Sequence, residues 1–282
     1  MRVSRQGSAD NCSVDWEKLT PSEEIGAADW IGGRLHPFGQ DVASVVPAGF
    51  EAYARIFHPA SRLAGTEQVE VRWSDVAEWS GRTVHPEMQF HTIAVPLPDR
   101  ETRLQAWSYE PWLGALSEGQ VRALVGLLAA HTATPDTCWF CVWDGCGSLN
   151  TSAVQWLRAD SGVGHHLQAW WWRVRVNFQR RKPVLPKGKL VRLPARDYLL
   201  FKGPLALALG HRDGPNLWWP DDRRWYVASE IDFPYTYVGG PKKLIDEILA
   251  DPSLEALPAA LDHGITAFSD TVNTEGFVGL EE

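Results

Sequence analysis

Cysteine is scarce in this chain, and long apolar runs are absent. Only four cysteines occur among 282 residues, too few for a disulfide framework at this length. No apolar run approaches the roughly 20 residues needed to span a bilayer. The stretch 1–15 lacks the apolar core of a secretory signal. We therefore expect a cytoplasmic protein that does not bind membranes.

Tryptophan, by contrast, is abundant. The 15 tryptophans are spread from Trp16 to Trp225, which argues against one aromatic platform and favours burial of most rings in a core. Neighbours on a strand point to opposite faces. We therefore expect either Trp218 or Trp219 to lie at the surface or under a loop.

The spacing of Cys138 and Cys141 invites a metal or redox interpretation. Their segment, "TCWFCVW", is β-branched and aromatic and predicts a strand that ends at a turn. Residues three apart on a strand point to opposite faces, so the two thiols are not expected to share an ion. We predict two buried cysteines, no metal site and no cofactor.

Hydrophobic periodicity predicts mixed secondary structure before residue 150. Residues 49–59 have strand character, and residues 72–81 favour a short helix capped by Ser74 and stopped by Gly81. Residues 85–98 are expected to begin irregularly and to end as a strand.

The clearest helix signal begins at Ser117. Ser117 and Gln120 form a capping box, and an apolar stripe follows as far as about His131. The stripe consists of Val121, Leu124, Val125 and Leu128.

The second half of the chain has several strand signals. Residues 158–166 are rich in turn formers and mark a candidate boundary. Strands are expected at 168–178, on both sides of Pro194, and at 223–233. A strand is expected to change to a helix at Gly240–Pro241.

The pattern as a whole predicts an α+β fold, mainly antiparallel sheet with a few packed helices. Asp251–Pro252 should begin one further short helix. We expect an irregular segment at 1–26 and α+β halves at 27–157 and 167–282. Two similar-sized halves and one continuous domain remain alternatives.

Three segments carry a family resemblance: "VPAGFEAYARIFHPA" (46–60), "FCVWDGCG" (140–147) and "PNLWWPDDRRWYVASEIDFPYTYVGG" (215–240). They resemble segments of an uncharacterised family of actinobacterial proteins, which implies no particular activity.

A second resemblance is carried by "LPARDYLLF" (193–201), "NLWWPDDRRWYVASE" (216–230) and "PKKLIDEIL" (241–249). This order is similar to that of the SUKH superfamily of toxin-immunity proteins, in which a leucine-proline-acid-tyrosine segment precedes a strand pair and a closing helix. The resemblance implies a binding protein without catalysis.

The densest positive charge lies between Arg173 and Lys202, where ten basic residues accompany one acid in a protein of net charge −8. Such asymmetry favours a partner of opposite charge. That partner is either an acidic protein or the acidic stretch 244–282, which has nine acids and no lysine or arginine. The net negative charge disfavours nucleic acid. The candidate partner-binding residues are Trp171, Arg173, Arg175, Arg180, Arg181, Lys182, Lys187 and Lys189.

A candidate anion site precedes the last strong helix pattern. Gly239 and Gly240 would expose backbone N–H groups at the helix start, and Lys242 and Lys243 lie in the first turn, where the helix dipole disfavours cations. A phosphate-bearing ligand would offset the unfavourable position of these lysines at the positive end of the helix. The alternative interpretation is a tight strand-to-helix turn without a ligand.

Catalytic candidates are few. Glu230 and Asp232 are expected to share one strand face, where paired carboxylates can serve acid–base chemistry. The alternative is a solvated face opposite Arg223 and Arg224. We therefore expect a non-catalytic binding protein that docks a macromolecular partner, immunity-like or regulator-like, through the basic, Trp-flanked strand. The alternatives are a hydrolase using Glu230 and Asp232, and a protein that binds nucleic acid or a phosphate ligand.

Overall fold

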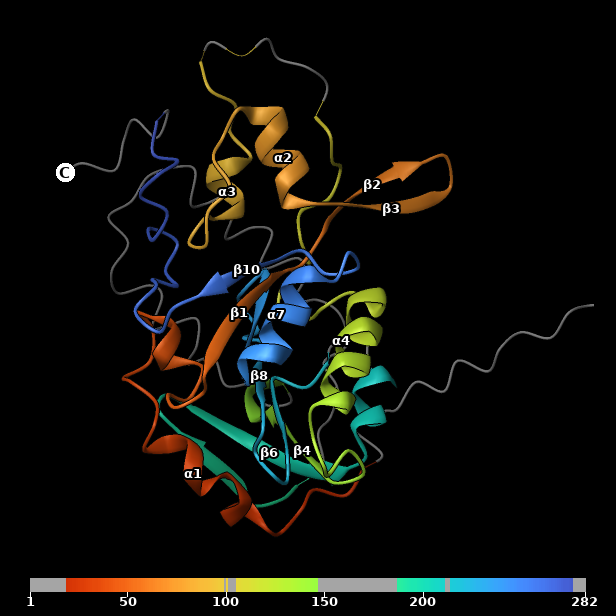
Figure 1. Cartoon of the computed structure of the whole chain (residues 1–282), viewed down its shortest axis with the longest axis vertical. Coiled ribbons are helices and arrows are strands. Elements are labelled where there is room, and N and C mark those ends of the chain that lie inside the picture. Colours follow the sequence, from red (N-terminus) through yellow and green to blue (C-terminus); the bar gives the residue numbers. More distant parts are fainter. Residues whose placement is uncertain (1–18, 99, 101–104, 147–186, 211–213, 276–282) are drawn as a thin grey trace, which may run out of the picture.

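Eight strands form one antiparallel sheet in the order β10-β1-β9-β8-β7-β4-β6-β5 (Figure 1). The computed structural model describes residues 19–98, 100, 105–146, 187–210 and 214–275. The strands of this sheet are β1 (Ala52–Phe57), β4 (Cys138–Trp143), β5 (Leu190–Leu193), β6 (Arg196–Gly203), β7 (Leu217–Pro220), β8 (Tyr226–Ala228), β9 (Tyr235–Gly240) and β10 (Ala256–Ala259). Two further strands, β2 (Ala60–Ala64) and β3 (Glu67–Val71), form a separate hairpin.

Helices pack on both faces of the large sheet. The described helices are α1 (Asp29–Gly32), α2 (Trp73–Ser80), α3 (Phe90–Ile93), α4 (Glu118–Ala130) and α7 (Lys242–Ala250), with short 3-10 turns η2 (Ile25–Ala28), η3 (Val42–Ser44), η4 (Asp144–Cys146) and η5 (Leu205–Gly210). The predicted α+β class with a mainly antiparallel sheet is therefore confirmed.

Two apolar clusters form the core, one on each face of the sheet. α1, α2 and α3 contribute to the first cluster, and α4 and α7 contribute to the second. Trp219 belongs to the first cluster and Trp218 to the second, and both rings are buried. One ring was expected either at the surface or under a loop. Neither ring is at the surface, because both faces of the sheet are covered, and Trp219 lies beneath a layer made largely of irregular segments and short helices.

The cysteine-containing strand forms as predicted. Cys138 lies in the cluster that contains α4, and Cys141 lies in the cluster on the opposite face. The expectation that strand geometry separates the two thiols is confirmed, and both are free and buried.

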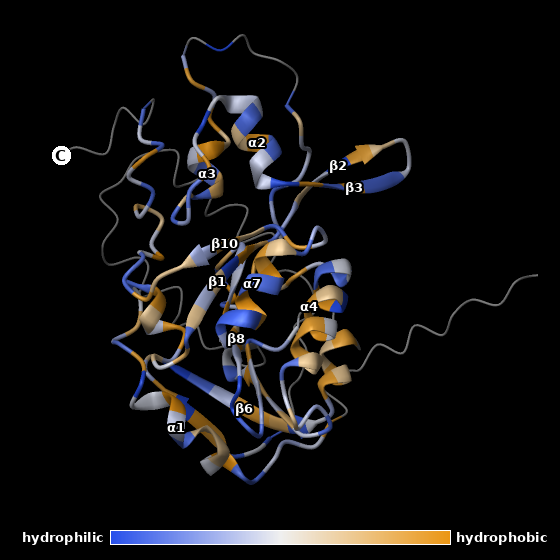
Figure 2. Ribbon diagram, viewed as in Figure 1, coloured by the Kyte–Doolittle hydropathy of each residue, from blue (hydrophilic) through white to orange (hydrophobic). Residues whose placement is uncertain are grey.

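The predicted capping box at the start of α4 is also confirmed. The Gln120 N–H donates to Ser117 Oγ at 3.3 Å, and the Ser117 N–H donates to Gln120 Oε1 at 3.2 Å. Leu124 and Leu128 are fully buried. Figure 2 shows apolar residues along α4 and α7, and those of α7 pack against the sheet in the same cluster.

The predicted cap of α2 was wrong, although Gly81 ends the helix in the left-handed conformation as expected. The helix begins at Trp73, and its first N–H groups are capped by a distant carboxylate. Glu255 accepts hydrogen bonds from the N–H groups of Trp73 and Ser74, both at 2.7 Å. This tertiary partner replaces the local cap expected at Ser74.

Two further local predictions were wrong. Residues 85–98 contain α3 instead of a terminal strand, and Asp270 accepts hydrogen bonds from the Gln89 N–H and the Thr92 hydroxyl there. Asp251–Pro252 begins a turn instead of a helix, and the chain then pairs with β1 as β10. In both places a contact distant in sequence decides the local structure.

Strands from before and after the candidate boundary share the large sheet. β1 lies between β9 and β10, and β4 lies between β6 and β7. The strands expected around Pro194 form the β5–β6 hairpin, with Leu193 opposite Arg196. The boundary at 158–166 and the strand expected at 168–178 lie outside the described residues.

Candidate functional site

The large sheet ends at β5, which pairs with β6 on one side. Within the described part of the chain, no strand pairs with its other side. In an antiparallel ladder only every second residue bonds to its neighbour, so the remaining N–H and C=O groups of an end strand face outward. We use the name β5 edge for residues 187–193, which comprise β5 and the three residues before it.

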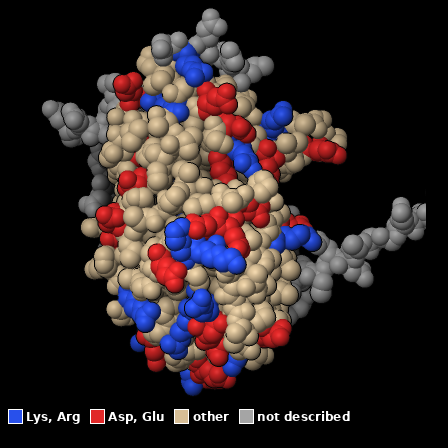
Figure 3. All heavy atoms as spheres, viewed as in Figure 1, with Lys and Arg blue, Asp and Glu red and all other residues tan. Residues whose placement is uncertain are grey.

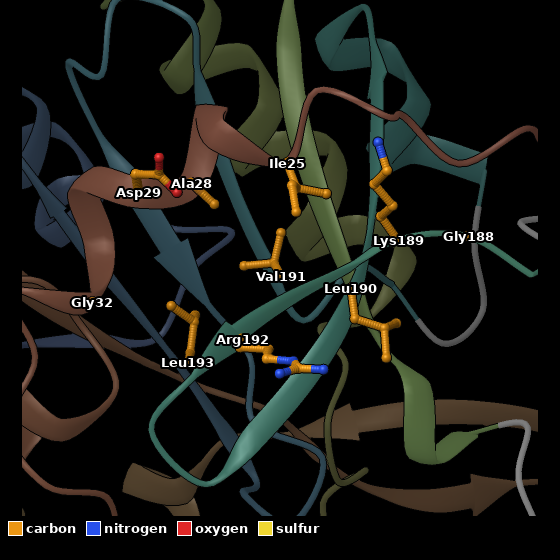
Figure 4. A pocket seen from close by; sticks show the side chains of 10 residues that line it. All are labelled: Ile25, Ala28, Asp29, Gly32, Gly188, Lys189, Leu190, Val191, Arg192 and Leu193. Atoms are coloured by element: carbon orange, nitrogen blue, oxygen red, sulfur yellow. The ribbon is translucent and has the colours of Figure 1, made fainter.

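A cavity of about 830 Å³ lies between the β5 edge and the segment η2–α1. Its lining comprises Ile25, Ala28, Asp29 and Gly32 on one side and residues 188–193 on the other. In Figure 4 the side chains of Ile25 and Val191 point toward each other across it, and that of Arg192 lies on the other side of the strand. The β5 edge thus combines open backbone groups with an adjacent recess that both apolar and charged residues line.

Three exposed basic side chains line the β5 edge: Lys187, Lys189 and Arg192. Lys189 Nζ lies 2.9 Å from Glu23 Oε2, and both side chains are more than half exposed. A surface pair of this kind contributes only about 0–1 kcal/mol. A carboxylate from another molecule can therefore replace Glu23 at little cost.

The structure describes only two of the predicted partner-binding residues, Lys187 and Lys189, and places both on the β5 edge. The others lie outside the described residues: Trp171, Arg173, Arg175, Arg180, Arg181 and Lys182.

The candidate catalytic carboxylates meet at Arg196. Its Nη2 atom lies 2.7 Å from Glu230 Oε2 and 3.3 Å from Asp232 Oδ2. The Arg196 guanidinium also lies 4.9 Å from the ring centre of Phe38 and 5.1 Å from that of Trp143. A cation between two aromatic rings is held firmly in place.

Two expectations about these carboxylates were wrong. β8 ends at Ala228, so Glu230 and Asp232 lie in the following turn and share no strand face. Their basic partner is Arg196, with which both form ion pairs, instead of Arg223 and Arg224.

Burial makes Glu230 an unusual carboxyl group. It is only 3% exposed, and this burial raises its pKa, while Arg196 and a hydrogen bond from the Tyr198 hydroxyl oppose the rise. A carboxyl group with a raised pKa can serve as a general acid. However, the lining of the cavity includes neither Glu230 nor Asp232.

At the candidate anion site, a side chain of the protein already meets the helix start. The Lys242 N–H donates to Glu51 Oε2 at 2.9 Å. Lys242 Nζ lies 2.6 Å from Asp246 Oδ2, and Lys243 Nζ lies 3.8 Å from Glu247 Oε1.

Contrary to expectation, Gly239 and Gly240 do not lie free at the helix start but are the last two residues of β9 and pair with β1. Packing leaves little room for a side chain at either position. A Cβ at Gly239 would lie 2.6 Å from the Phe50 ring, and one at Gly240 would lie 2.9 Å from the Leu244 side chain. These contacts explain the Gly-Gly sequence without a ligand.

Sequence reasoning missed a buried cluster around Asp270. The carboxylate accepts hydrogen bonds from His85 Nε2 at 2.8 Å, from the Asn273 N–H at 2.9 Å and from the Thr92 hydroxyl. Burial alone would raise the pKa of Asp270, but the bonds from Thr92, Asn273 and His85 outweigh it and lower the pKa to about 2. Because its members lie up to 185 residues apart, no local pattern reveals the cluster.

His58 was also missed. Its Nδ1–H donates to the Trp112 carbonyl at 2.6 Å, and its Nε2 accepts from the Thr236 hydroxyl at 2.9 Å. Ser229 Oγ lies 2.7 Å from Thr236 Oγ1 and completes the buried chain. Burial lowers the pKa of His58 to about 4, with the bond to Trp112 opposing it, so the ring is neutral at physiological pH.

The chain matches no family model, no curated protein and no solved structure. In the described part of the chain, none of the helices has both the length and the apolar character required to cross a bilayer.

Proposed function

We propose that this protein binds a macromolecular partner without catalysis, and that the β5 edge receives an extended, acidic segment of a partner protein. The observation that carries the proposal is the open side of β5 beside a cavity of about 830 Å³. Adding a strand to an open sheet edge is a common mode of peptide recognition. Backbone hydrogen bonds provide affinity, and recesses for alternate side chains provide specificity.

The charge of the β5 edge supports an acidic partner. Lys187, Lys189 and Arg192 are exposed there, and they belong to the stretch from Arg173 to Lys202 with ten basic residues and one acid. Opposite charge on the partner would speed encounter and exclude basic competitors.

An external partner is favoured over the acidic stretch 244–282 of the same chain. Several acids of that stretch already have other contacts. Glu247 Oε2 lies 2.7 Å from His131 Nε2, and Glu255 caps α2. Asp270 is buried in the cluster with His85, Thr92 and Asn273.

The hydrolase alternative has less support. Both candidate carboxylates, Glu230 and Asp232, are paired with Arg196, and neither lines the cavity. The similarity to the SUKH superfamily also implies binding without catalysis. The expected cytoplasmic location stays a prediction, and the proposed partner would share that compartment.

Binding of nucleic acid is also less well supported than binding of a peptide. An open strand edge offers both unpaired N–H donors and unpaired C=O acceptors, which suit another polypeptide backbone, whereas phosphate contacts require donors only. The net charge of −8 opposes a polyanion away from the basic stretch.

The test is fluorescence anisotropy with a labelled peptide that alternates glutamate and valine, with a lysine–valine peptide of equal length as control. We expect the intact chain to bind only the acidic peptide. The variant Lys189→Glu/Arg192→Glu should bind it at least about tenfold more weakly, since both charges would then repel it.

The matched control is Arg122→Glu/Arg224→Glu, which makes the same charge change at exposed positions outside the β5 edge. Equal weakening in both variants would mean that net charge alone attracts the peptide, and would contradict the proposal. Failure of the intact chain to bind the acidic peptide would contradict it too. Stronger binding of short duplex DNA than of the peptide would favour the nucleic-acid alternative.

A further inference from the structure

The β2–β3 hairpin projects from the body of the molecule (Figure 1). Its strands pair from Ala60–Val71 to Ala64–Glu67, and Gly65 at the turn has a φ of +66°. In β3 the side chains from Glu67 to Glu70 are all exposed. A two-stranded hairpin with so little burial is marginally stable alone, so contact with another surface would stabilise it.

β3 is a second open edge in the molecule. On the other side of the hairpin, β2 forms a bridge from Ser61 to Tyr109. Among the described residues, β3 pairs only with β2. Its outward N–H and C=O groups are therefore open to another strand, as those of β5 are.

The open strand β3 carries exposed acids, whereas the exposed arginine of the hairpin, Arg62, lies on β2. Figure 3 shows both acidic and basic side chains on the projecting hairpin. Glu67 and Glu70 lie on β3 and form no ion pair with any other described residue. Leu63 is 53% exposed and Val69 is 37% exposed. Figure 2 shows hydrophilic residues near the tip of β3 and hydrophobic residues at the end of β2.

We infer that the β2–β3 hairpin of one copy binds the β5 edge of a second copy, with β3 added to β5 as a neighbouring strand. This inference rests on the proposed function of the β5 edge and names a second copy of the chain as one partner. Glu67 and Glu70 would face Lys189 and Arg192. Leu63 or Val69 would enter the recess beside Val191.

Charge selects this pairing over the two symmetric ones. Two β3 strands would bring glutamates together, and two β5 edges would bring Lys187, Lys189 and Arg192 together. Like charges across a strand pair are destabilising, and opposite charges are favourable. The unlike combination is the only one of the three with complementary charge.

The pairing must occur between two copies. Figure 1 places the hairpin at the opposite end of the molecule from the β6 region that carries β5. Two different surfaces then meet, so the contact is head-to-tail and produces a ring or an open chain of copies. Because so few residues pair, the interface falls in the small class, below about 1,200 Å², that is typical of weak complexes.

The experiment is sedimentation velocity on the full chain over a range from about 1 μM to about 1 mM, which covers weak association. We expect concentration-dependent association that weakens with added salt. The variants Glu67→Lys/Glu70→Lys and Lys189→Glu/Arg192→Glu should each remain monomeric, with circular dichroism spectra that match the unmodified chain. Mixing the two variants should restore association. The unmodified β5 edge of the first variant can bind the unmodified hairpin of the second, and the two surfaces with reversed charge are also complementary.

The control Arg122→Glu/Arg224→Glu should associate as the unmodified chain does. A chain that stays monomeric over the whole range would overturn the inference, and so would a mixture of the two variants that fails to associate. The acidic-peptide experiment distinguishes failure of the inferred pairing between copies from failure of the proposed function of the β5 edge. If the peptide binds the β5 edge while the chain stays monomeric, only the inference fails, whereas failure of both experiments removes the proposed function as well.

Discussion

Arg196 Nη2 lies 2.7 Å from Glu230 Oε2, with the side chains of Arg196 and Glu230 13% and 4% exposed. An ion pair so well shielded from water depends on both partners. Removing Glu230 leaves the shielded Arg196 with only the more exposed and more distant Asp232 as an acidic partner, at 3.3 Å, and this costs more than loss of an exposed pair.

Glu230→Gln should lower the free energy of unfolding by about 3 kcal/mol or more. Asp232→Asn is the matched control, since the Asp232 side chain is 54% exposed and its contribution should stay within about 1 kcal/mol. The double variant Arg196→Met/Glu230→Leu should be more stable than Glu230→Gln, because it leaves no buried charge. Urea denaturation measures all three, and equal losses for Glu230→Gln and Asp232→Asn would contradict the expectation.

His58 should make the protein sensitive to mild acid. Its pKa is about 4 in the folded chain, below the ordinary value of 6.5, so the unfolded chain binds more protons between these values. The free energy of unfolding should therefore decrease as the pH falls from 6.5 toward 4. Protonation of His58 Nε2 would also break its bond from the Thr236 hydroxyl.

His58→Gln should flatten this part of the pH profile, even if the variant is less stable at neutral pH. His36→Gln is the control, because the side chain of His36 is 59% exposed. Chemical denaturation at a series of pH values supplies the profiles. The same slope in His58→Gln and the unmodified chain would assign the effect to other groups.

Local signals sufficed where neighbouring residues determine the structure. The capping box of Ser117 and Gln120 lies within one helical turn, and the strand Cys138–Trp143 follows from its composition. The strand-to-helix change near Gly240 has the same local origin, although the helix begins at Lys242.

Local signals failed where distant residues decide. Glu255 caps α2 from 181 residues away, and Asp270 bonds to Gln89 at the start of α3 across the same separation. Irregular segments and short helices form much of the layer over Trp219. Such segments have little hydrophobic periodicity, so the sequence did not indicate that both faces of the sheet are covered.

The candidate site shows the same division. The surplus of positive charge that reaches the β5 edge is visible in the sequence as a run of lysines and arginines. The open side of β5 can be recognised only once the order of strands in the sheet is known. The ion pair between Arg196 and Glu230 joins residues 34 apart in the sequence, so it can be recognised only in the folded chain.

Asp270 should respond to stronger acid than His58 does. Its pKa of about 2 lies below the ordinary value of 3.8, so its contribution to stability is complete above about pH 4 and is lost as the pH falls toward 2. Asp270→Asn should destabilise the neutral protein by at least about 2 kcal/mol, since several buried donors lose a charged acceptor. The difference in free energy of unfolding between Asp270→Asn and the unmodified chain should become smaller as the pH falls from 4 to 2.

Asp262→Asn is the control for Asp270, because Asp262 is an exposed acid eight residues away in the same segment. Acid titration monitored by tryptophan fluorescence measures the difference. A gap between Asp270→Asn and the unmodified chain that persists unchanged to pH 2 would show that the carboxylate charge is not what stabilises the cluster.

Cys138 and Cys141 should be inert to thiol reagents and should hold no shared zinc. They lie on opposite faces of the sheet, and burial raises the pKa of Cys138 to about 12, with nearby aspartates adding to the rise. Burial also raises the pKa of Cys141 well above its ordinary value. The thiolate is the form that reacts with thiol reagents and binds metal, so both reactions are suppressed.

In a Cys12→Ser/Cys146→Ser background, a colorimetric thiol titration should detect essentially no thiol in the native protein and both thiols after unfolding. Elemental analysis should find no zinc that is lost on replacing either remaining cysteine with serine. Rapid modification of the native protein, or about one zinc per chain that depends on both cysteines, would contradict the placement of β4 in the sheet.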